Sequence, residues 1–492
     1  MTHLNLTSKA KILCTMGPAI ASATKVANLV RAGANAFRLN MSHGSHAMHE
    51  EFIAHIRAAE QKLGVHLPIV ADLQGPKIRV GDFGPDIDVL NLVPGTEVKL
   101  ADVAVIKAEK LTVSDQLIPV HYPTLASDVK KGDALLLDDG LLKLEVRKTT
   151  ATTVTCFVVH GGELKPRKGI NLPHTNVSQP SITSKDRADV RFAIDHQLDY
   201  IALSFVRTAQ DVDTVRKYIV KNGGTQPVIS KIEKPEALDN IEDIIRASDI
   251  IMVARGDLGV EIPSEHVPMV QKNIIHLCNQ HAVPVITATQ MLESMIRAPR
   301  PTRAEASDVA NAVLDGTDAV MLSAETSVGA YPVEAVHYMR QICDAASTQM
   351  AKDERLYVPG ATAVLTQQQN TASIAMAAAR IANEQRVDAI VSLSHSGETV
   401  RLISNRRPNA AILCVTSNAS VARRMGLLWG VTGAVVDTAS STDETIEHIE
   451  TWLVRQRILP VGSTVIFTVG RPLVGRARTN MLSIEMLQPV RK

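Results

Sequence analysis

Eight short apolar segments, separated by longer stretches with helical spacing, constrain the fold of this chain more than any other feature. Two of them lie between residues 10 and 42, one at residues 68–74 and five between about 180 and 345. They read KILCTM, AFRLNMS, PIVADLQ, YIALSFV, VISKIE, IIMVAR, VPVITATQ and DAVMLSAE. Eight alternating strand and helix units predict a closed (β/α)8 TIM barrel of parallel strands. A doubly wound open sheet is the alternative, and the number of strands argues against it.

Two other regions have different patterns. Residues 76–177 alternate with period two, as in Leu142, Leu144 and Val146, which predicts an inserted all-β domain, a small β-barrel placed as a lid. Asp139-Gly140 and Gly161-Gly162 are expected to form hairpin turns. After residue 346 an Ala-rich helical stretch and several strand-like runs predict a separate three-layer α/β domain, with a regulatory role. The expected division is 1–75 and 178–345 for the barrel, 76–177 for the lid and 346–492 for the C-terminal domain.

The composition excludes several classes of function. The 492 residues carry 52 basic and 51 acidic side chains, and only 3% are aromatic, so nothing resembles the basic surplus of a nucleic-acid binder. No run of 18 or more apolar residues is present, so we expect no membrane span. The N-terminus lacks the apolar core of a signal peptide, and the five cysteines are scattered. These features predict a cytoplasmic protein with reduced thiols.

Polar and charged residues follow the ends of at least six of the eight predicted strands. In barrel enzymes the carboxyl ends of the strands and the loops after them carry the catalytic residues. Any one of these residues alone is more typical of a turn or a cap, but their convergence on one rim indicates a site. The residues at these ends are Arg38, Asn40, Ser42, Asp72, Lys231, Glu233, Arg255, Gly256, Asp257, Thr289, Ser323 and Glu325.

The residue types at this rim suit a metal beside a phosphate. Lys231 and Glu233 fall on the same side of a strand end, since side chains alternate with period two. Glu233 and Asp257 offer the oxygen ligands that Mg2+ or Mn2+ prefers, and Lys231 and Arg38 suit a phosphate. The alternative for Lys231 and Glu233 is an ion pair that merely caps the sheet. Metal, phosphate and a backbone cradle for a carboxylate after Gly256 together predict phosphoryl transfer involving a small phosphorylated acid.

At this point the chain resembles the pyruvate kinases over essentially its whole length. The resemblance rests on FRLNMSHG, DLQGPKIR, RKGINLP, SKIE, MVARGDLGVEI, TATQMLESM and the long run from PTRAEASDVANAV to SAETSVGAYPVEAV. It implies transfer of the phosphoryl group of phosphoenolpyruvate to ADP, giving pyruvate and ATP, the last step of glycolysis. It implies that Arg38 contacts the substrate phosphate, that Lys231 stabilises the transferring phosphoryl group, and that Glu233 and Asp257 bind Mg2+. It also implies that the substrate is bound by Gly256, Asp257 and Thr289. The residues that it implies for nucleotide binding are Asn40, His43, Arg79 and Lys168.

Lys77 departs from the commoner pattern of that family. The resemblance implies a K+ site at Asn40, Ser42, Asp72 and Leu73, and potassium-dependent members have Glu at the position of Lys77. This chain reads DLQGPKIR there and so resembles the potassium-independent subgroup. A Lys ammonium supplies the single positive charge that a monovalent ion would otherwise place near Asp72. We therefore expect that K+ is not required and that any K+ site is vestigial. His174 is another departure from the family pattern, and we have no physical explanation for it.

The C-terminal domain carries an expected effector site. The strand-to-helix turn in SLSHSGETVR presents Ser394, Ser396, Gly397 and Thr399, a pattern typical of a phosphate cradle at a helix N-terminus. It resembles the effector-phosphate loop of the pyruvate kinases, and residues 470–480 resemble their second effector loop. The resemblance implies a sugar-phosphate or nucleotide effector and a homotetramer.

Two other functions compete with this interpretation. One is a metal-dependent barrel lyase or aldolase acting on oxaloacetate-like acids, which needs neither the lid nor the basic residues Arg79 and Lys168. The other is a catalytically silent metabolite sensor, in which the metal ligands or Lys231 are expected to be lost. Both Glu233 and Lys231 are present.

Overall fold

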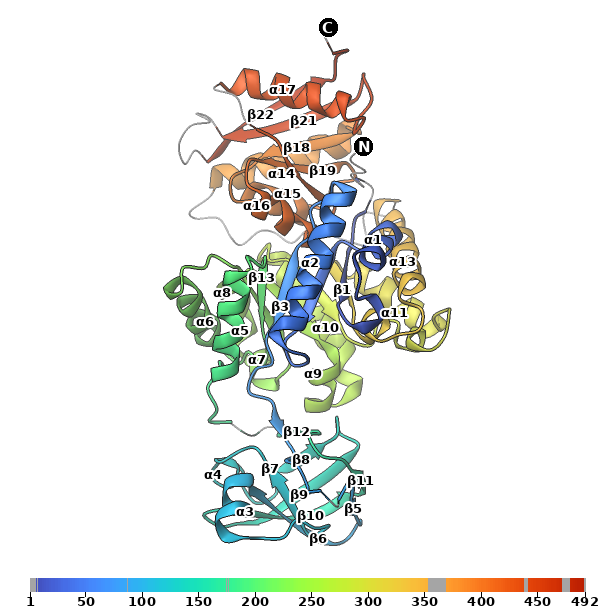
Figure 1. The fold of residues 1–492 in the computed structure, drawn as a ribbon. Coiled ribbons are helices and arrows are strands. Elements are labelled where there is room, and N and C mark those ends of the chain that lie inside the picture. The colour runs from blue at the N-terminus through green and yellow to red at the C-terminus, as the bar shows by residue number, and fades with distance from the viewer. Residues whose placement is uncertain are drawn as a thin grey trace.

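The chain forms three parts arranged in a row (Figure 1). The computed structural model describes residues 6, 8–85, 87–173, 175, 177–352, 369–437, 441–470 and 478–490. A barrel occupies the middle, a β-rich lid hangs from one end of it, and an α/β domain covers the other end. His174 lies outside the described residues.

The middle part is the predicted barrel. Its eight strands form a closed ring in which every neighbouring pair is parallel. The open-sheet alternative is therefore wrong. Nearly all strand residues are buried, because one face packs into the barrel interior and the other against helices. In chain order the strands are β1 (Lys11–Thr15), β2 (Ala36–Asn40), β3 (Ile69–Asp72), β13 (Tyr200–Leu203), β14 (Val228–Ile232), β15 (Ile250–Ala254), β16 (Val285–Ala288) and β17 (Ala319–Leu322).

Helices surround this ring, and several begin at side-chain caps. Thr302 starts α11 with a capping box, in which its hydroxyl accepts from Glu305 N while the Glu305 carboxylate accepts from Thr302 N. Thr183 does the same for α5. The helical segments of the barrel are η1 (Pro18–Ile20), α1 (Ala23–Ala32), α2 (His46–Leu63), α5 (Ser184–Asp195), α6 (Ala209–Lys221), α7 (Pro235–Asp239), α8 (Ile241–Ala247), α9 (Arg255–Glu261), η2 (Ser264–His266), α10 (Val267–Gln280), η3 (Glu293–Ile296), α11 (Arg303–Leu314), α12 (Ala324–Ser327) and α13 (Pro332–Lys352).

The lid is a strongly curved sheet. Its seven-stranded order is β4-β12-β8-β9-β10-β6-β7, and a bridge between Val80 and Val120 brings the two edges together. It is not purely β, because it also contains two short helices. Asp139-Gly140 does lie in the β8–β9 turn, but Gly161-Gly162 joins β10 to a strand of another sheet, so that hairpin prediction is wrong. The elements are β4 (Ile78–Arg79), β5 (Leu90–Leu92), β6 (Glu97–Asp102), α3 (Val103–Glu109), β7 (Leu117–Val120), α4 (Leu125–Asp128), β8 (Ala134–Leu137), β9 (Leu142–Thr149), β10 (Thr153–His160), β11 (Gly162–Leu164) and β12 (Gly169–Asn171).

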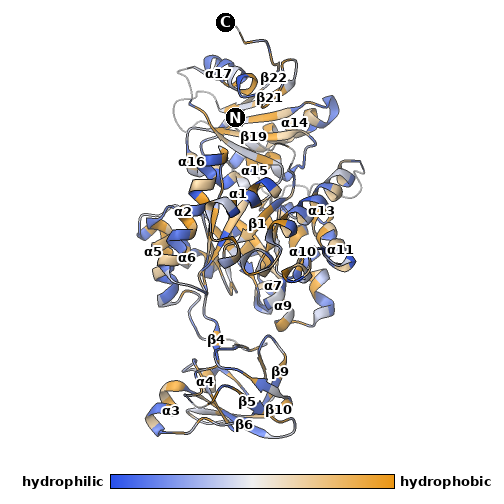
Figure 2. Cartoon of the chain, turned by 45° about the vertical axis from the view of Figure 1, so that its right-hand side comes forward, coloured by the Kyte–Doolittle hydropathy of each residue, from blue (hydrophilic) through white to orange (hydrophobic). Residues whose placement is uncertain are grey.

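The C-terminal domain has the predicted three layers. Alternate residues of its strands feed two separate cores, one under α14 to α16 and one under α17. Its strand order is β20-β19-β18-β21-β22, and the last strand, which is antiparallel, was not predicted. Figure 2 shows the mostly hydrophobic strands enclosed by helices of mixed character. The elements are α14 (Gln369–Gln385), β18 (Ala389–Leu393), α15 (Glu398–Asn405), β19 (Ala411–Thr416), α16 (Ala419–Arg424), η4 (Met425–Leu427), β20 (Val431–Val435), α17 (Thr442–Arg455), β21 (Thr464–Gly470) and β22 (Thr479–Met486).

The C-terminal domain packs against the amino ends of the barrel strands. Arg407 pairs with Asp318 at 2.7 Å, just before β17, and Arg423 pairs with Asp199 at 2.8 Å, just before β13. The opposite rim, with the carboxyl ends of the strands, therefore faces the lid (Figure 1). The domain boundaries at residues 75, 177 and 345 stay predictions, and α13 continues to Lys352. None of the helices in the described ranges is long and apolar enough to cross a membrane.

Candidate active site at the carboxyl ends of the barrel strands

A chain of alternating charges lies at the carboxyl ends of β2, β3 and β14. Arg38 Nε donates to Asp72 Oδ2 at 2.6 Å, and Lys231 Nζ lies 3.2 Å from Asp72 Oδ1. Lys231 Nζ also lies 2.9 Å from Glu233 Oε1. Lys231 is therefore one cation shared by two carboxylates. The ion pair of Lys231 with Glu233, which was the alternative to a functional site, is present, but it belongs to a larger cluster that includes Asp72 and Arg38.

Ser204 completes the surroundings of Lys231. The ammonium donates to Ser204 Oγ at 2.7 Å, and that hydroxyl donates to the carbonyl oxygen of Leu73 at 2.7 Å. The backbone N–H of Phe205 donates to Glu233 Oε2 at 2.8 Å. The sequence interpretation named no residue at the ends of the first and fourth barrel strands, and Ser204 follows the fourth. The position directly after the apolar run YIAL would have identified Ser204.

Burial and charge set the protonation of this cluster. Burial alone would lower the pKa of Lys231, but the carboxylates of Asp72 and Glu233 outweigh it and raise the pKa above its usual value. Burial works against the ionised form of Asp72, yet Lys231 and Arg38 hold its pKa below the usual value. Burial raises the pKa of Glu233, and the negative charge of Asp257 adds to this effect. Asp257 thus lies close enough to Glu233 for the two carboxylates to repel each other.

Thr289 and Gly256 meet at the ends of β15 and β16. Gly256 N–H donates to Thr289 Oγ1 at 2.7 Å, and Thr289 Oγ1 donates to the carbonyl oxygen of Ala288 at 2.6 Å. Thr289 and Gln290 have φ angles of +68° and +54°, in the left-handed region that residues with a side chain rarely adopt. In this structure the groups predicted to hold a substrate carboxylate bind one another.

Arg255 holds this unusual backbone in place. Its guanidinium donates to the carbonyl oxygens of Thr289, at 2.8 Å, and Gln290, at 3.2 Å. The same group pairs with Asp308 of α11 at 2.7 Å. The sequence placed Arg255 at the rim but gave no signal for this positioning role, because its partners are carbonyl oxygens of another loop.

Two further predicted rim residues support the same edge. Asn40 Oδ1 accepts from Ser42 N at 3.2 Å, which closes the turn after β2. Glu325 is buried, accepts from the backbone of Ser323 at 2.7 Å and of Leu292 at 3.1 Å, and has a pKa raised by its burial. Ser323 and Glu325 thus organise the loop after β17.

The basic residues predicted to meet the nucleotide separate into two groups. Burial lowers the pKa of His43, and the charges of Arg79, Arg38 and Lys77 lower it further, so these cations lie around His43. Lys168 instead pairs with Asp138 of the lid at 2.7 Å, and Arg79 also donates to the lid, at Arg167 O. In this structure Lys168 is thus held by the lid.

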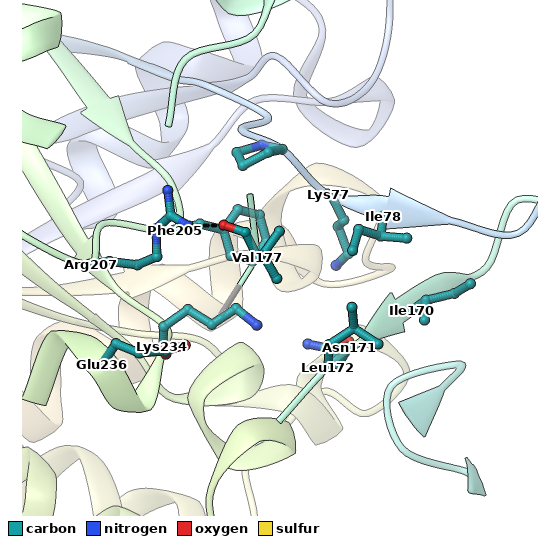
Figure 3. Close-up of a pocket in the computed structure, with 11 residues that line it drawn as sticks. Lys77, Ile78, Ile170, Asn171, Leu172, Val177, Phe205, Arg207, Lys234 and Glu236 are labelled. Atoms are coloured by element: carbon teal, nitrogen blue, oxygen red, sulfur yellow. Dashed lines mark hydrogen bonds between the residues drawn. The ribbon is translucent and has the colours of Figure 1, made fainter. Parts of the chain in front are cut away.

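Lys77 reaches the metal-ligand side of the rim. Its Nζ lies 3.4 Å from Asp257 Oδ1, across the connection between lid and barrel. Figure 3 shows Lys77 and Lys234 on facing walls of a narrow pocket of about 30 Å3 at this connection. Lys234 Nζ lies 2.6 Å from Glu261 Oε1, and Asn171 of β12 donates to the same oxygen at 2.8 Å. This link between lid and barrel was not predicted.

The predicted effector loop is described only in part. Ser394 Oγ accepts from Gly397 N at 2.9 Å, and Ser396 Oγ accepts from Glu398 N at 3.4 Å. Thr399 is buried, with its hydroxyl 2.6 Å from that of Thr479. Residues 471–477 of the second predicted loop lie outside the described residues. The four predicted residues therefore form one turn, with its hydroxyls bonded within the protein.

The candidate metal site rests on two carboxylates. Among the residues that the structure describes, no group of three or more His, Cys, Asp or Glu side chains is arranged to hold a metal ion. Glu233 and Asp257 are close enough to interact, and Asp257 is 29% exposed. A divalent cation between them would relieve their repulsion and keep positions open for substrate oxygens and water, as Mg2+ prefers. The residues present fit such an ion.

Comparison with known proteins gives a consistent result. Residues 7–336 match the family "Pyruvate kinase, barrel domain" and residues 372–485 match "Pyruvate kinase, alpha/beta domain". A pyruvate kinase of Geobacillus stearothermophilus is 44% identical over 482 residues, 97% of this chain and 80% of that protein. One from Staphylococcus aureus strain MRSA252 is 42% identical over 481 residues, with the same shares. A crystal structure of a pyruvate kinase from Cryptosporidium parvum superposes with a TM-score of 0.89 at 34% identity, covering 98% of this chain and 96% of that one.

These matches extend over the barrel, the lid and the C-terminal domain together. Neither a lyase nor a silent sensor is supported by any of them, and the resemblance predicted from the rim residues is confirmed. Enzymes of this kind transfer a phosphoryl group from phosphoenolpyruvate to ADP, with a divalent metal. From its sequence and its fold, the chain belongs to the pyruvate kinase family.

Proposed function

We propose that the rim transfers the phosphoryl group of phosphoenolpyruvate to ADP with Mg2+, or Mn2+, and without a requirement for K+. The single observation that carries this proposal is the shared position of Lys231. It lies 3.2 Å from Asp72 and 2.9 Å from Glu233, beside the metal-ligand candidate Asp257. Phosphoryl transfer depends on positioning and on neutralising the charge of the moving group, and this arrangement supplies a fixed cation for it.

Each remaining rim residue has a role in this proposal. Arg38, held by Asp72 and by Thr15 Oγ1 at 3.1 Å, binds the substrate phosphate. Lys231 stays protonated because of its two carboxylates and faces the phosphoryl group during transfer. Gly256 N–H and the Thr289 hydroxyl exchange their mutual hydrogen bond for bonds to the substrate carboxylate. Asn40, His43 and Arg79, joined by Lys168 when the lid closes, bind the phosphates of the nucleotide.

Glu233 and Asp257 would hold the divalent metal. When bound, Mg2+ supplies Lewis-acid stabilisation of the phosphate and enolate oxygens. The fit rests on their placement, because Glu233 and Asp257 follow the ends of the neighbouring strands β14 and β15 and both offer carboxylate oxygens. Lys231 Nζ lies 2.9 Å from Glu233 and balances the charge of that carboxylate.

The independence from K+ is supported by the partners of the oxygens at the family's K+ site. Both oxygens of Asp72 lie against cations, Arg38 and Lys231. Asn40 Oδ1 accepts from Ser42 N, and the Leu73 carbonyl accepts from Ser204. The oxygens that the resemblance assigns to K+ thus already have positively charged or hydrogen-bonding partners from the protein. Potassium-dependent relatives have Glu at position 77, whereas Lys77 supplies a positive charge there; its ion pair is with Asp257, at 3.4 Å, and not with Asp72, near which it was expected.

The remaining parts of the proposal concern the whole protein. We infer a cytoplasmic homotetramer, in keeping with five buried free cysteines and the habit of the family. Ser394, Ser396, Gly397 and Thr399 are proposed to hold the phosphate of a sugar-phosphate or nucleotide effector. In this structure the hydroxyls of Ser394 and Ser396 accept from backbone N–H groups, and each would donate its own proton to the phosphate.

A coupled assay tests the reaction directly. The full chain is supplied with phosphoenolpyruvate and ADP in tetramethylammonium buffer, and pyruvate formation is followed with and without MgCl2. Turnover that needs Mg2+, with stoichiometric ATP, is the expected result. Release of pyruvate from oxaloacetate without nucleotide at a higher rate, or turnover unaffected by chelation, would contradict the proposal.

A further inference from the structure

The end of β2 and the loop after it carry two of the residues proposed above to bind the phosphates of ADP, Asn40 and His43. The side chain of His43 is exposed, so its position depends on how the backbone of the loop is held. Inside the loop, the backbone N–H of His43 donates to Asn40 O at 3.2 Å, and that of Ser42 donates to Asn40 Oδ1 at 3.2 Å. The carbonyl oxygens of Met41 and His43 are bound from outside, by side chains of α5 and α2. Two helices therefore set the position of this loop.

His49 of α2 binds the carbonyl oxygen of His43. Its ring is buried, and Nε2 donates to His43 O at 3.0 Å. Because a carbonyl oxygen can only accept, the proton of the ring is on Nε2. Nδ1 is buried and has no hydrogen-bond partner among the described residues, and burial lowers the pKa of His49. The ring is therefore neutral at pH 7 and serves the loop as a hydrogen-bond donor without a charge.

Asp189 of α5 organises the second contact with the loop. Its carboxylate is buried; Oδ2 accepts from Lys185 Nζ at 2.6 Å, and Oδ1 accepts from His46 Nε2 at 2.8 Å. Lys185 Nζ also donates to Met41 O at 2.6 Å. The ring of His46, the first residue of α2, stacks on Phe192 of α5 with ring centroids 4.4 Å apart. Asp189 therefore holds both the lysine that binds the loop and the start of the helix that follows it.

The same helix α5 also anchors the two connections to the lid. Asp186 Oδ1 accepts from the backbone N–H of Gly75, which precedes β4, at 3.0 Å. Asp186 Oδ2 accepts from the backbone N–H of Thr183, which follows β12, at 2.8 Å. The lid and the loop after β2 are both proposed to contribute groups to the nucleotide site. Since both are tied to the first turns of α5, this helix sets their positions relative to each other.

We propose that His49 and Asp189 are positioning residues for the nucleotide, which hold the loop after β2 so that Asn40 and His43 meet the phosphates of ADP. Both side chains are buried, so they act through the loop and do not touch the nucleotide. A loop that is not held in advance must be ordered when ADP binds, and this ordering lowers the affinity. The inference rests on the proposed function, because it takes the loop to be part of the nucleotide site.

Calorimetric titration of the full chain with ADP and MgCl2 tests the role of His49. His49→Leu removes the donor to His43 O without changing the charge of the protein. His49→Gln restores an N–H donor at about the same reach. The matched control is His55→Leu, which makes the same replacement more than one turn further along α2, away from the loop.

Asp189→Asn separates positioning from electrostatics. Loss of a negative charge would by itself favour the binding of anionic ADP. Asn has one acceptor oxygen where Asp189 uses two, so the variant cannot hold both Lys185 and His46. The two effects therefore have opposite signs. The control is Asp195→Asn, which makes the same charge change at an exposed residue of α5.

His49→Leu and Asp189→Asn should each weaken the binding of ADP about 5- to 10-fold, because a buried hydrogen bond is lost and the loop is released. His49→Gln should bind ADP within about three-fold of the parent, and the two control variants within about two-fold. In steady-state assays the KM for ADP should rise in parallel, while the KM for phosphoenolpyruvate changes less than about two-fold. Melting temperatures show which variants are folded, and Asp189→Asn, which keeps the shape of its side chain, tests the same loop if His49→Leu is not.

Several results would overturn the positioning role. One is unchanged ADP affinity in folded His49→Leu. Another is equal weakening of ADP and phosphoenolpyruvate, which would mean a general loss of structure. Tighter binding of ADP by Asp189→Asn would show that only its charge matters. These outcomes leave the proposed reaction untouched, whereas a parent protein that binds ADP but forms no pyruvate in the coupled assay would contradict the reaction and leave the positioning role standing.

Discussion

Two buried lysines at opposite ends of the same barrel show how differently one residue type is used. Lys231 lies at the carboxyl end of β14 against Asp72 and Glu233. Lys11 begins β1 at the amino end, is fully buried, and donates to the backbone oxygen of Ser8 at 3.1 Å. Burial lowers the pKa of Lys11 to about 7, with Arg340 and Lys9 adding to the effect, whereas carboxylates raise the pKa of Lys231. Burial of a charge is thus not by itself the mark of a functional site.

The wider surroundings of the two lysines differ in the same way. At the amino end, arginines neutralise buried carboxylates and also bond backbone atoms, and Asp199 pairs with both Arg57 and Arg423. Arg407, for example, pairs with Asp318 and donates to Gly316 O at 2.7 Å. At the carboxyl end one cation is shared among several carboxylates, and Asp257 stays partly exposed. One cation shared among carboxylates beside open space suits chemistry, whereas arginines that surround buried carboxylates suit the joining of two domains.

The largest expected effect is on turnover at the carboxyl end. Lys231→Met should lower kcat by about 10^3-fold, because it removes the cation that stabilises the transferring phosphoryl group. Binding of phosphoenolpyruvate, measured by fluorescence titration, should change far less. Lys11→Met is the matched control and should keep the kcat of the parent per folded molecule. Equal loss of turnover in both variants would show that the two lysines do not differ in their contribution to catalysis, which would contradict this comparison.

At the amino end the largest effect should be on stability. Arg407→Met leaves Asp318 buried without its cation and should lower the free energy of unfolding by about 3–5 kcal/mol. Arg380→Gln, which breaks an exposed pair with Glu384, should cost less than about 1 kcal/mol. Urea unfolding monitored by circular dichroism measures both. A small effect at Arg407 would mean that this interface tolerates an unpaired charge.

The low pKa of Lys11 predicts a dependence of stability on pH. The unfolded chain binds this proton up to about pH 10.5, whereas the folded chain releases it near pH 7. The unfolded state therefore holds more protons between these values, and the free energy of unfolding should rise with pH across this window. Lys11→Met should stabilise the protein by about 5 kcal/mol at pH 6 and by about 2 kcal/mol at pH 9. A gain that is constant with pH would refute the assignment to Lys11.

The smallest expected effect concerns the connection between lid and barrel. Asn171→Ala removes the hydrogen bond from β12 to Glu261, worth about 1 kcal/mol. Because the lid then holds its position less firmly, kcat/KM for ADP should fall by about five-fold. Thr155→Ala, in a lid strand away from the barrel, provides the control in the same steady-state assay. An unchanged kcat/KM would show that this bond does not help to place the lid.

The predictability of the molecule also differs between these regions. The barrel was predictable because eight apolar runs with intervening helical spacing allow few other architectures. The rim was predictable because strand ends in a parallel barrel must converge, which brought Arg38, Asp72 and Lys231 together. Ser204 and the carbonyl partners of Arg255 were not predictable, because contacts between loops leave no periodic signal in the sequence. The antiparallel β22 was missed because TNMLSIEM mixes polar and apolar residues along an edge strand.

The contacts between domains were the least predictable part. The pairing of Arg407 with Asp318 joins residues 89 positions apart, and neither residue belongs to a local pattern. Four arginines that line one cavity between the barrel and the C-terminal domain come from four separate helices: Arg216 from α6, Arg246 from α8, Arg401 from α15 and Arg424 from α16. Such clusters depend on how two folded domains pack against each other, and periodic patterns in one sequence carry no information about that packing.

The central claim is that the carboxyl-end rim supplies its cations from its own side chains, Lys231 and Lys77. Steady-state turnover of the parent protein in tetramethylammonium buffer, titrated with KCl from zero to about 100 mM at constant ionic strength, measures this most directly. We predict that rates change less than about two-fold for the parent, while Lys77→Glu is slow without K+ and is activated by it. Strong activation of the parent by KCl, with no difference between parent and Lys77→Glu, would contradict the claim.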